Sequence, residues 1–331
     1  MPLISIIIPT RNNEEHIAEA ITSCLDNKNN DYEIIIVNDA STDQTLTEIK
    51  KIFDIYPQKT SVITTEENIG LGPARNLGVS KAKGDYLMFL DGDDWFEPGA
   101  IDCVSKKLQQ TQADVLMFNH QRVWNHETRI PNIPNRYIDL NNQEKNISEP
   151  TERKGAIRNL HSACNKAYKL DFIIKNKISF PKGFYEDITW SFNSVIKAKK
   201  IYFIPEIIFN YRQRWGSITR REDDRHFDIF EKYRSILKLM AEKENYRKWY
   251  GDEAYEYGRS QIFGLFETGY RIPKRRQSEY LRTSYKLLNE WRKLQNIKYF
   301  DAKLIAAKIS KPTIYNAVAK VIKFSSSRIT R

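Results

Sequence analysis

Short apolar runs rich in β-branched residues recur along the first 120 residues, and the segments between them have helical spacing. Runs of this length between turn-forming segments predict β-strands. The predicted strands lie at 3–9, 32–39, 61–67, 85–91 and 113–119. Strands that alternate with helices in this way form a parallel sheet covered by helices on both faces. We therefore predict an α/β fold with a Rossmann-like, mostly parallel sheet flanked by helices.

The pattern changes after this series. Residues 121–160 are rich in Asn, Pro and charge, which predicts a loop or an insertion. Order returns with a helix at 183–198 and a strand at 201–215, and from about residue 222 the periodicity is helical. A boundary near residue 220 therefore divides the chain into an α/β domain, 1–220, and a mainly helical C-terminal region, 221–331.

Charge is distributed unevenly between these two parts. Residues 1–224 hold 29 Lys and Arg against 31 Asp and Glu, a balance of 29 − 31 = −2, whereas residues 225–331 hold 24 against 11, a balance of 24 − 11 = +13. A basic region attached to a neutral body predicts an acidic partner, either anionic lipid or nucleic acid. Since no recognised nucleic-acid motif accompanies the charge, we expect no nucleic-acid partner.

One segment of the basic region carries an apolar stripe. A helix over 311–324 would place five apolar residues on one face, flanked by Lys311, Lys320 and Lys323: Ile314, Ala317, Val318, Val321 and Ile322. Such a face most often packs on its own domain. It also suits an anionic membrane interface or the contact surface of an oligomer, and the pattern leaves all three uses open.

The sequence carries no sign of secretion or membrane insertion. No run reaches the ~18 apolar residues of a spanning helix, and the N-terminal apolar run lacks a basic segment before it. Cys24, Cys103 and Cys164 have neither disulfide nor metal-ligand spacing. We expect a cytoplasmic protein in a reducing compartment, and peripheral contact with the inner face of the cell membrane is one of the uses left open for the basic region.

Polar residues follow three of the predicted strands. They lie at 9–13, 38–43 and 91–94. Because ligands of open α/β sheets bind at the carboxyl ends of the strands, these three segments should converge on one cleft.

The stretch FLDGDDW at 89–95 carries the strongest chemical signal. Asp91, Asp93 and Asp94 lie too close together for all three to ionise easily without a cation among them. Carboxylate oxygens suit Mg²⁺ or Mn²⁺, which commonly bridge proteins to substrate phosphates, and Gly92 permits a close approach. The plainer alternative is an acidic turn that ends a strand.

Two further residues at the strand ends suit a nucleotide. Asp39 can accept a hydrogen bond from a base edge or a ribose hydroxyl, or it can simply shape its turn. Gly70, Gly72 and Pro73 open a helix whose first turn presents Arg75, and a guanidinium there favours a phosphate or a base carbonyl. GLGPARN alone is a weak signal because it matches neither a P-loop nor GxGxxG.

Six segments in order resemble the inverting family 2 nucleotide-sugar glycosyltransferases with the A-type fold. The resemblance covers roughly residues 3–220 and rests on PTRNNEEHIAEAI, EIIIVNDASTDQT, NIGLGPARNLGVSKAKGDYLMFLDGDDW, CNKAY, YEDITW and NYRQRWGSITR. It implies a catalytic domain at 1–220, while 221–331 is left for contact with an acceptor, a membrane or a second copy.

The resemblance also implies roles for single residues. Asp187 matches the catalytic base, with Glu186 beside it. Asp93, together with Asp91, matches the ligands of Mn²⁺ or Mg²⁺. The positions expected to hold the nucleotide are Pro9, Thr10, Asp39, Arg75 and Asp91. Those expected near the donor sugar or its diphosphate are Asp94, Lys166, Arg212, Arg214 and Ser217. One departure is Cys164, because the family often has Trp before the pair that Asn165 and Lys166 match.

These roles imply a metal-dependent inverting transfer of a sugar from a UDP-sugar to a hydroxyl of a growing surface glycan. The expected acceptors are a capsular polysaccharide, an exopolysaccharide, a lipid-linked oligosaccharide or a teichoic-type polymer. Two alternatives stay open: a nucleotidyltransferase acting on sugar phosphates, and a non-catalytic scaffold that binds nucleotide sugars.

Overall fold

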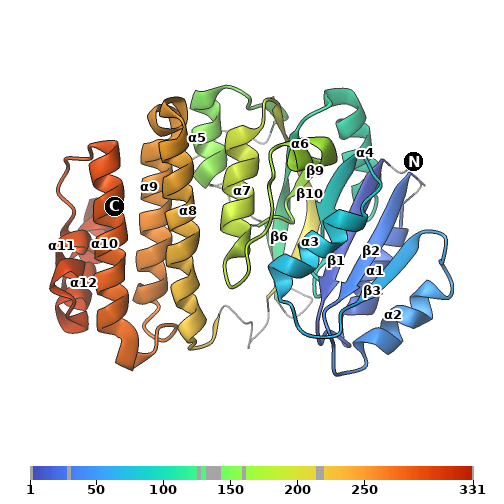
Figure 1. The fold of residues 1–331 in the computed structure, drawn as a ribbon, viewed down its shortest axis with the longest axis horizontal. Coiled ribbons are helices and arrows are strands. Elements are labelled where there is room, and N and C mark those ends of the chain that lie inside the picture. The colour runs from blue at the N-terminus through green and yellow to red at the C-terminus, as the bar shows by residue number, and fades with distance from the viewer. Residues whose placement is uncertain are drawn as a thin grey trace. The chain divides into compact units, whose positions relative to one another are not determined.

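The computed structural model describes residues 3–27, 31–124, 128–131, 143–158, 162–213 and 220–329. Its core is one mixed sheet whose hydrogen-bonded path runs β3-β2-β1-β4-β9-β6-β10-β5 (Figure 1). The strands of this path are β1 (Ile4–Thr10), β2 (Tyr32–Asn38), β3 (Thr60–Thr64), β4 (Tyr86–Phe89), β5 (Trp95–Phe96), β6 (Val115–Trp124), β9 (Lys166–Lys169) and β10 (Ile201–Gln213). Two short strands lie off the path, β7 (Thr128–Pro131) beside β6 and β8 (Lys145–Asn146) beside β10.

The predicted mostly parallel sheet is confirmed. Strands β3, β2, β1 and β4 run parallel to their neighbours, and so do β6 and β10. Strand β9 joins these two parallel groups and is antiparallel to both β4 and β6. All five strands expected in the first 120 residues are present as β1, β2, β3, β4 and β6.

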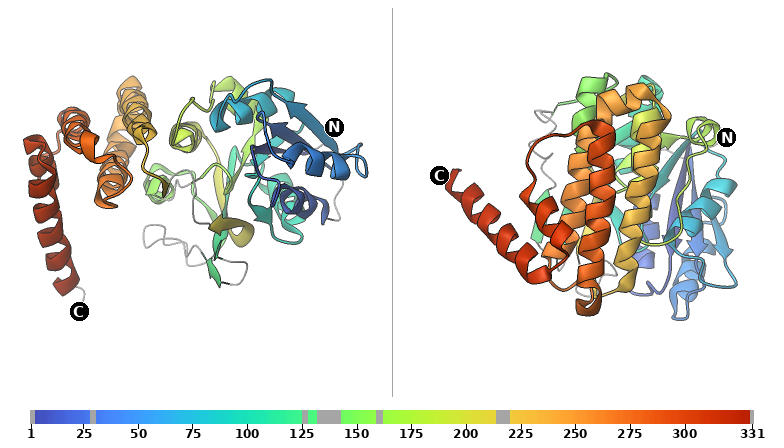
Figure 2. Two further views of the ribbon diagram at one scale, coloured as in Figure 1. Left: turned by 90° about the horizontal axis from the view of Figure 1, so that it is seen from below. Right: turned by 60° about the vertical axis from the view of Figure 1, so that its left-hand side comes forward.

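Helices cover both faces of this sheet. Figure 2 shows α3 (Leu71–Lys81) and α7 (Glu186–Lys197) on one face and α1 (Ile17–Leu25) and α4 (Ala100–Thr111) on the other. The remaining helices of this part are α2 (Thr45–Phe53), α5 (Pro150–Arg158) and α6 (Leu170–Lys175). Every residue of β1 is buried, so the polar groups at its end are held on a rigid strand.

An aromatic cluster lies under α7. The rings of Phe180 and Trp190 stack with centroids 4.1 Å apart, and Phe89 meets the Trp190 ring edge-on at 5.3 Å. Since Phe89 ends β4 and Trp190 lies on α7, this cluster fixes the start of α7 relative to the acidic turn that follows β4.

The region 121–160 is more ordered than predicted. Strand β6 continues to Trp124, β7 and β8 follow, and α5 begins at Pro150. At the start of this region the polar Gln121 is buried in a strand, where its Nε2 donates to Asn210 Oδ1 over 2.7 Å across the β6–β10 pair. Residues 125–127, 132–142 and 159–161 of this region lie outside the described residues.

The C-terminal region is helical, as predicted. It comprises α8 (Asp228–Glu242), α9 (Glu244–Glu267), α10 (Gln277–Gln295), α11 (Ala302–Ile309) and α12 (Pro312–Ile329), with short 3₁₀ turns at Asp224–Phe227 and Lys274–Arg276. Its core is rich in fully buried aromatic side chains, among them Tyr233, Tyr255, Tyr280 and Trp291. Within the described ranges, no helix combines the length and the apolar character needed to cross a membrane.

Packing on its own domain, one of the three uses left open for the apolar stripe of α12, does not account for most of that stripe. The structure buries Tyr315 and Ala319 instead, whereas Ile314, Ala317 and Val321 are exposed. The aromatic ring of Tyr315 buries more apolar surface than an aliphatic stripe residue, and its hydroxyl finds a partner in Glu267.

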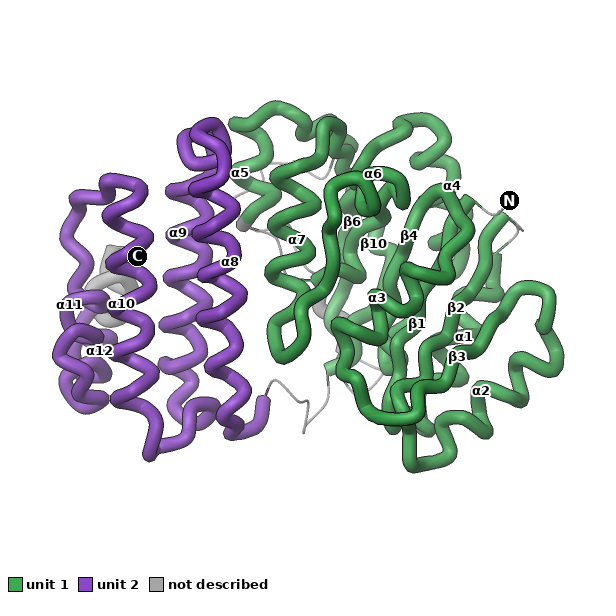
Figure 3. Tube along the Cα trace, viewed as in Figure 1, with its two compact units in different colours: residues 1–214 green, residues 215–331 purple. Residues whose placement is uncertain are grey.

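The chain divides into two compact units, residues 1–214 and 215–331 (Figure 3). The division lies close to the boundary predicted near residue 220. Unit 1 holds the sheet with its helices, and unit 2 holds α8 to α12.

Candidate active site

The acidic turn connects β4 to β5 and separates its three carboxylates by burial. Asp91 and Asp93 are half-buried, whereas Asp94 is buried and accepts a hydrogen bond from the backbone N–H of Arg212 at 2.8 Å. Burial raises the pKa of Asp94 well above its usual range, and the charges of Asp93 and Asp91 raise it further. Asp94 therefore supports the turn from inside, and its contact with the donor sugar stays a prediction.

Gly92 is required by the end of β1. A Cβ atom on Gly92 would lie 2.5 Å from Thr10 Oγ1 and 2.8 Å from Thr10 Cβ. Thr10 is itself buried and accepts from the amide of Asn13 over 3.2 Å. The glycine thus lets the acidic turn lie directly against the first polar strand end, and this convergence of β1 and β4 was predicted.

Arg75 of α3 binds three carboxylates inside the protein. Its Nη2 donates to Asp91 Oδ1 over 2.6 Å, and its Nη1 donates to Glu186 Oε1 and to Asp187 Oδ1, each over 2.7 Å. Burial alone lowers the pKa of Arg75, but Asp187, Asp91 and Glu186 together raise it well above its usual value. A fully buried guanidinium is tolerated because these partners compensate its charge.

The expected role of Arg75 in nucleotide binding stays a prediction, and its hydrogen-bond partners among the described residues are all carboxylates. Its side chain is only 1% exposed, and both of its terminal nitrogens are engaged by carboxylates. Arg75 instead connects the acidic turn after β4 to the first turn of α7.

Glu186 and Asp187 occupy the first turn of α7, where the helix dipole favours negative charge. The Asp187 side chain is 22% exposed and that of Glu186 is 9% exposed. Burial raises the pKa of Glu186 to about 7, and it also raises the pKa of Asp187, an effect that Arg75 opposes and Asp91 reinforces. Asp187 is therefore the more accessible of two carboxylates, with a pKa raised toward the range that suits a general base.

Lys166 lies beside this pair but faces inward. It is fully buried, and its ammonium donates to Ser162 O over 2.8 Å and to Asn165 Oδ1 over 2.6 Å. Burial lowers its pKa to about 7, against the opposing charge of Asp187. Its contact with the donor sugar or diphosphate stays a prediction. Cys164 is buried too, and burial raises the pKa of its thiol, so it stays uncharged.

Arg212 of β10 fixes the backbone of the acidic turn. Its Nε donates to the backbone oxygen of Asp93 over 2.7 Å, its Nη2 pairs with Glu19, and its guanidinium lies 4.5 Å from the centre of the Trp95 ring. These contacts account for the burial of Arg212, and its contact with a diphosphate stays a prediction. Arg214 and Ser217, predicted beside it, lie outside the described residues.

Asp39 closes the loop that leads into α3. Its Oδ1 accepts from the N–H of Ile69 at 2.8 Å, and its Oδ2 accepts from the N–H of Gly70 at 2.9 Å. Asp39 thus shapes its turn, and the predicted contact with a base or ribose stays a prediction. Pro9 is a buried residue within β1 and pairs in register with Val37.

Asn76 is a site residue that the sequence reasoning missed. Its Nδ2 donates to the backbone oxygen of Phe180 over 2.8 Å, and its Oδ1 accepts from the N–H of Phe180 at 2.9 Å. Asn76 follows Arg75 in the sequence ARN. Its place on the same helix turn as a predicted site residue was the signal that could have indicated a role at the site. The two neighbours attach α3 to the carboxylates and to the segment before α7.

The carboxylates of the acidic turn fit a divalent ion that is shared with a phosphate ligand. Asp91 and Asp93 offer accessible oxygens of the kind that Mg²⁺ and Mn²⁺ prefer. Across the described ranges, no three His, Cys, Asp or Glu side chains gather into a preformed metal site. Ligands beyond these two carboxylates would come from phosphate and water.

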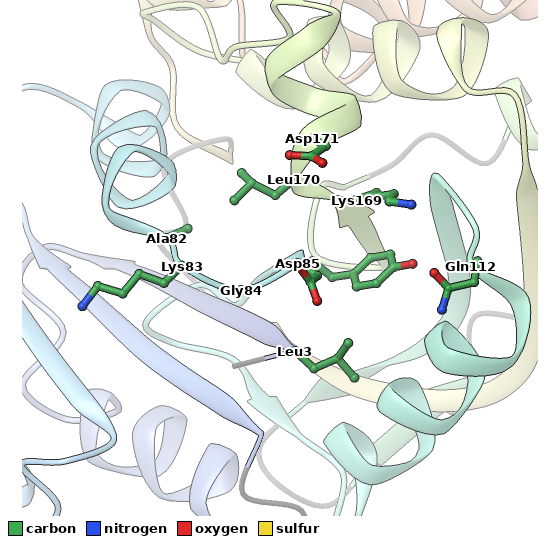
Figure 4. Close-up of a pocket in the computed structure, with 10 residues that line it drawn as sticks. Leu3, Ala82, Lys83, Gly84, Asp85, Gln112, Lys169, Leu170 and Asp171 are labelled. Atoms are coloured by element: carbon green, nitrogen blue, oxygen red, sulfur yellow. The ribbon is translucent and has the colours of Figure 1, made fainter. Parts of the chain in front are cut away.

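A separate pocket of about 580 Å³ lies at the opposite edge of the sheet (Figure 4). It is lined by Leu3, which precedes β1, by Asp85 and Tyr86 at the start of β4, and by Lys169 at the end of the antiparallel β9. Because ligands of such sheets bind at the carboxyl ends of the parallel strands, this pocket is not the active site.

The fold and the carboxylates at its strand ends are those of a glycosyltransferase, and comparison with known proteins identifies the family. Residues 5–169 match the model described as glycosyl transferase family 2. The chain belongs to this family.

Two bacterial relatives extend the similarity beyond that domain. The chain is 27% identical over 257 residues to the putative glycosyltransferase EpsH of Bacillus subtilis, covering 75% of this chain and 72% of EpsH. It is 29% identical over 250 residues to the glycosyltransferase GlyG of Streptococcus pneumoniae, covering 73% of this chain and 79% of GlyG.

The fold is similar to that of TarS from Staphylococcus aureus, a poly(ribitol-phosphate) beta-N-acetylglucosaminyltransferase. The crystal structure of TarS residues 1–349 matches with a TM-score of 0.72 and 20% identity, covering 98% of this chain and 92% of that one. The same fragment has a crystal structure in complex with UDP-GlcNAc. The predicted A-type glycosyltransferase fold with a helical C-terminal region is thereby confirmed.

Proposed function

We propose that this glycosyltransferase moves a sugar from a UDP-sugar to a hydroxyl of a growing surface glycan, with inversion at the anomeric carbon. One observation carries the proposal: Arg75 holds Asp187 and Asp91 on a single guanidinium. A carboxylate that can act as a base is thereby fixed beside a carboxylate that suits a metal-bound diphosphate.

The relatives support a choice of donor and acceptor. TarS binds UDP-GlcNAc in one of its structures, and its name describes transfer of N-acetylglucosamine to a poly(ribitol phosphate). UDP-GlcNAc is therefore the first donor to test, and a teichoic-type polymer is the first acceptor, followed by other exopolysaccharides.

In the proposed reaction, Asp187 accepts the proton of the acceptor hydroxyl. The oxygen of that hydroxyl forms a bond to the anomeric carbon, while the bond between that carbon and the diphosphate oxygen breaks. The diphosphate leaves with the bonding electron pair as part of UDP. A divalent ion bound by Asp93 and Asp91 would offset the negative charge on this leaving group.

Each of the surrounding residues keeps the base or the turn in place. Arg75 orients Asp187 and keeps its carboxylate ionised by compensating its charge. Arg212 and Asp94 fix the backbone of the acidic turn, so that Asp93 is presented from a rigid loop. The three cysteines are free thiols, which fits an enzyme that works in the reducing cytoplasm.

The test is release of free UDP from UDP-GlcNAc and other UDP-sugars, with Mn²⁺ or Mg²⁺, by the wild type and by Asp93→Ala and Asp187→Asn. We expect turnover to be lost in both variants and kept in Asp54→Asn, which changes an exposed aspartate on another surface. All four proteins should have the same circular dichroism.

Other outcomes would favour the alternatives. Retained turnover in either variant would remove the role proposed for that residue. Release of pyrophosphate in place of UDP would indicate a nucleotidyltransferase. Donor binding without turnover, across a broad acceptor panel, would indicate a non-catalytic scaffold.

A further inference from the structure

Exposed apolar side chains concentrate in one short stretch of unit 2. Among the described residues, thirteen large hydrophobic side chains are exposed, and six of them lie between residues 299 and 321. We call these six the C-terminal apolar surface: Tyr299, Phe300, Ile305, Ile309, Ile314 and Val321. Phe300 is 77% exposed and Val321 is 66% exposed. Such a concentration marks an interaction site, since isolated exposed residues are common but clusters are not.

Helix α11 has apolar residues on two sides. Leu304 and Ala307 are buried against the rest of unit 2, whereas Ile305 and Ile309, four residues apart, share an exposed face.

Helix α12 repeats this arrangement. Its buried side carries Tyr315, whose hydroxyl donates to Glu267 Oε1 over 2.9 Å and whose ring meets Phe263 and Phe266. Its other side carries Ile314 and Val321, seven residues apart on one face. One face therefore completes the core, and the second apolar face is exposed to solvent. The figures place α12 beside α11 at the end of the unit (Figure 2).

The segment that carries this surface is strongly basic, and the nearest exposed acid from another helix is Glu256 of α9, which accepts a hydrogen bond from the Tyr299 hydroxyl. Residues 296–331 contain eight basic residues and one acidic residue, a balance of 8 − 1 = +7: Lys298, Lys303, Lys308, Lys311, Lys320, Lys323, Arg328 and Arg331 against Asp301. The carboxylate of Asp301 is fully buried and paired with Arg259. The segment therefore presents no exposed carboxylate, while Lys308, Lys311 and Lys320 are exposed next to the apolar residues.

We propose that α11 and α12 dock this enzyme on an anionic lipid bilayer, with the C-terminal apolar surface in the interface and the lysines on the lipid headgroups. Apolar residues flanked by lysines, in a segment whose single acid is buried, are the composition that binds such interfaces. A second copy of the chain fits less well, because a symmetric contact would bring the exposed Lys308, Lys311 and Lys320 of both copies together. The docking proposal does not depend on the identity of the donor or the acceptor.

The experiment is flotation of the full chain with vesicles of phosphatidylcholine alone and of phosphatidylcholine with phosphatidylglycerol. We expect binding to the anionic vesicles only, weakened by added salt. Val321→Asp should reduce the vesicle-bound fraction by about tenfold or more, because it places a charge in the interface. Ile55→Asp is the matched control, since Ile55 is also 66% exposed but lies in unit 1, and it should bind like the wild type.

The lysines can be tested separately from the apolar residues. Lys311→Glu and Lys320→Glu should each weaken binding to anionic vesicles by about fivefold or more, as expected for a basic residue at a charged membrane surface. Lys50→Glu changes an exposed lysine of α2 and should have no effect. All variants should keep the UDP release of the wild type in solution, so a failed membrane test is distinct from a failed activity test.

Two results would overturn the proposal. One is equal binding to neutral and anionic vesicles, or equal losses from Val321→Asp and Ile55→Asp. The other is an absence of vesicle binding together with a dimer, measured by light scattering, that Val321→Asp dissociates. That second result would assign the surface to a second copy of the chain.

Discussion

The buried guanidinium of Arg75 donates to the carboxylate of Asp187 over 2.7 Å, although 112 residues separate the two in the sequence. The same guanidinium holds Asp91 over 2.6 Å. The position of the proposed base is thus set by the same side chain that fixes the start of the acidic turn. A disturbance at Arg75 should therefore affect the chemical step more than the affinity for the donor.

Arg75→Lys tests this coupling. Lysine keeps the positive charge but lacks the planar fork that reaches three carboxylates, so Asp187 loses its orientation. We expect kcat for UDP release to fall by about a hundredfold, with the donor KM changed by less than about threefold. Steady-state kinetics on folded protein measures both. Arg11→Lys, at an exposed arginine after β1, is the control. A raised donor KM with an unchanged kcat would support the prediction that Arg75 binds the nucleotide.

The two neighbouring acids of α7 should differ in their effect on activity. Asp187→Asn removes the proposed proton acceptor and should lower kcat by about a thousandfold. Glu186→Gln removes a less exposed carboxylate and should lower kcat by less than about tenfold. The comparison needs both proteins to have the wild-type unfolding temperature. If Glu186→Gln were the more damaging change, the base would be Glu186.

The pH dependence of the reaction follows from the raised pKa of Asp187. The base is ionised only above this pKa, so kcat/KM should fall on the acid side as the pH drops through it, at a higher pH than for an ordinary aspartate. Glu186→Gln removes the neighbouring carboxyl, whose own pKa burial raises to about 7. If Asp187 is the base, the acid limb of the kcat/KM profile should remain in this variant. Loss of the limb would assign the titration to Glu186.

Asp301→Asn should destabilise unit 2. Asp301 pairs with Arg259 of α9 and caps α11 by accepting from the N–H of Leu304 at 3.0 Å. The variant leaves a partly buried guanidinium without its counter-charge, so we expect a loss of about 2–3 kcal/mol in the free energy of unfolding. Urea denaturation measures it, and Asp252→Asn, an exposed change on α9, should be nearly neutral.

The effect of Asp301→Asn should also depend on pH. Burial alone raises the pKa of Asp301, but the hydrogen bonds and charge of Arg259 outweigh it and lower the pKa below its usual value. The stabilisation is therefore present above the pKa of the unfolded state and is lost as the pH falls through the folded value. The difference between wild type and variant should shrink in acid, and a constant difference would mean that the pair is not the cause.

Gly92→Ala and Gly264→Ala form a matched pair. A Cβ at residue 92 would collide with Thr10, whereas a Cβ at residue 264, inside α9, would meet nothing within 4 Å. We expect Gly92→Ala to lower stability by about 1–3 kcal/mol and to reduce UDP release, and Gly264→Ala to be neutral or stabilising because alanine favours a helix. Thermal unfolding distinguishes them, and an equally stable Gly92→Ala would mean that the turn can move away from β1.

The strands and the convergence of their ends could be predicted from the sequence. The spacing of hydrophobic residues, the β-branched residues and the turn-forming residues are all local properties of the chain. The partners of the site residues could not be predicted in this way. Arg75 and Arg212 were assigned to a ligand by residue type and position. The structure pairs Arg75 with acids 111 and 112 residues away, and Arg212 with Asp93 and Asp94, 119 and 118 residues away. Only the folded chain brings these groups together, so a motif identifies the cleft but not which of its charges compensate one another.

The same limit explains two further differences. The end of β6 was predicted as part of a loop, and the buried face of α12 could not be predicted. Gln121 was predicted to lie in a loop because it is polar, and its hydrogen-bond partner Asn210 is distant in the sequence. Residues of α12 offer two apolar faces, and nothing in the spacing tells which one the rest of unit 2 will cover.

The side chain of Asn76 makes two hydrogen bonds with the backbone of Phe180. These contacts limit how this enzyme can be recombined with its relatives. Close by, a Cβ on Gly72 would lie 2.4 Å from the carbonyl oxygen of Pro181, so α3 and residues 180–181 are fitted to each other. A chimaera that borrows the segment between β6 and α7 from another parent should place its crossover before Phe180. A crossover after Pro181 would combine the α3 of one parent with residues 180–181 of the other, which were not fitted to it.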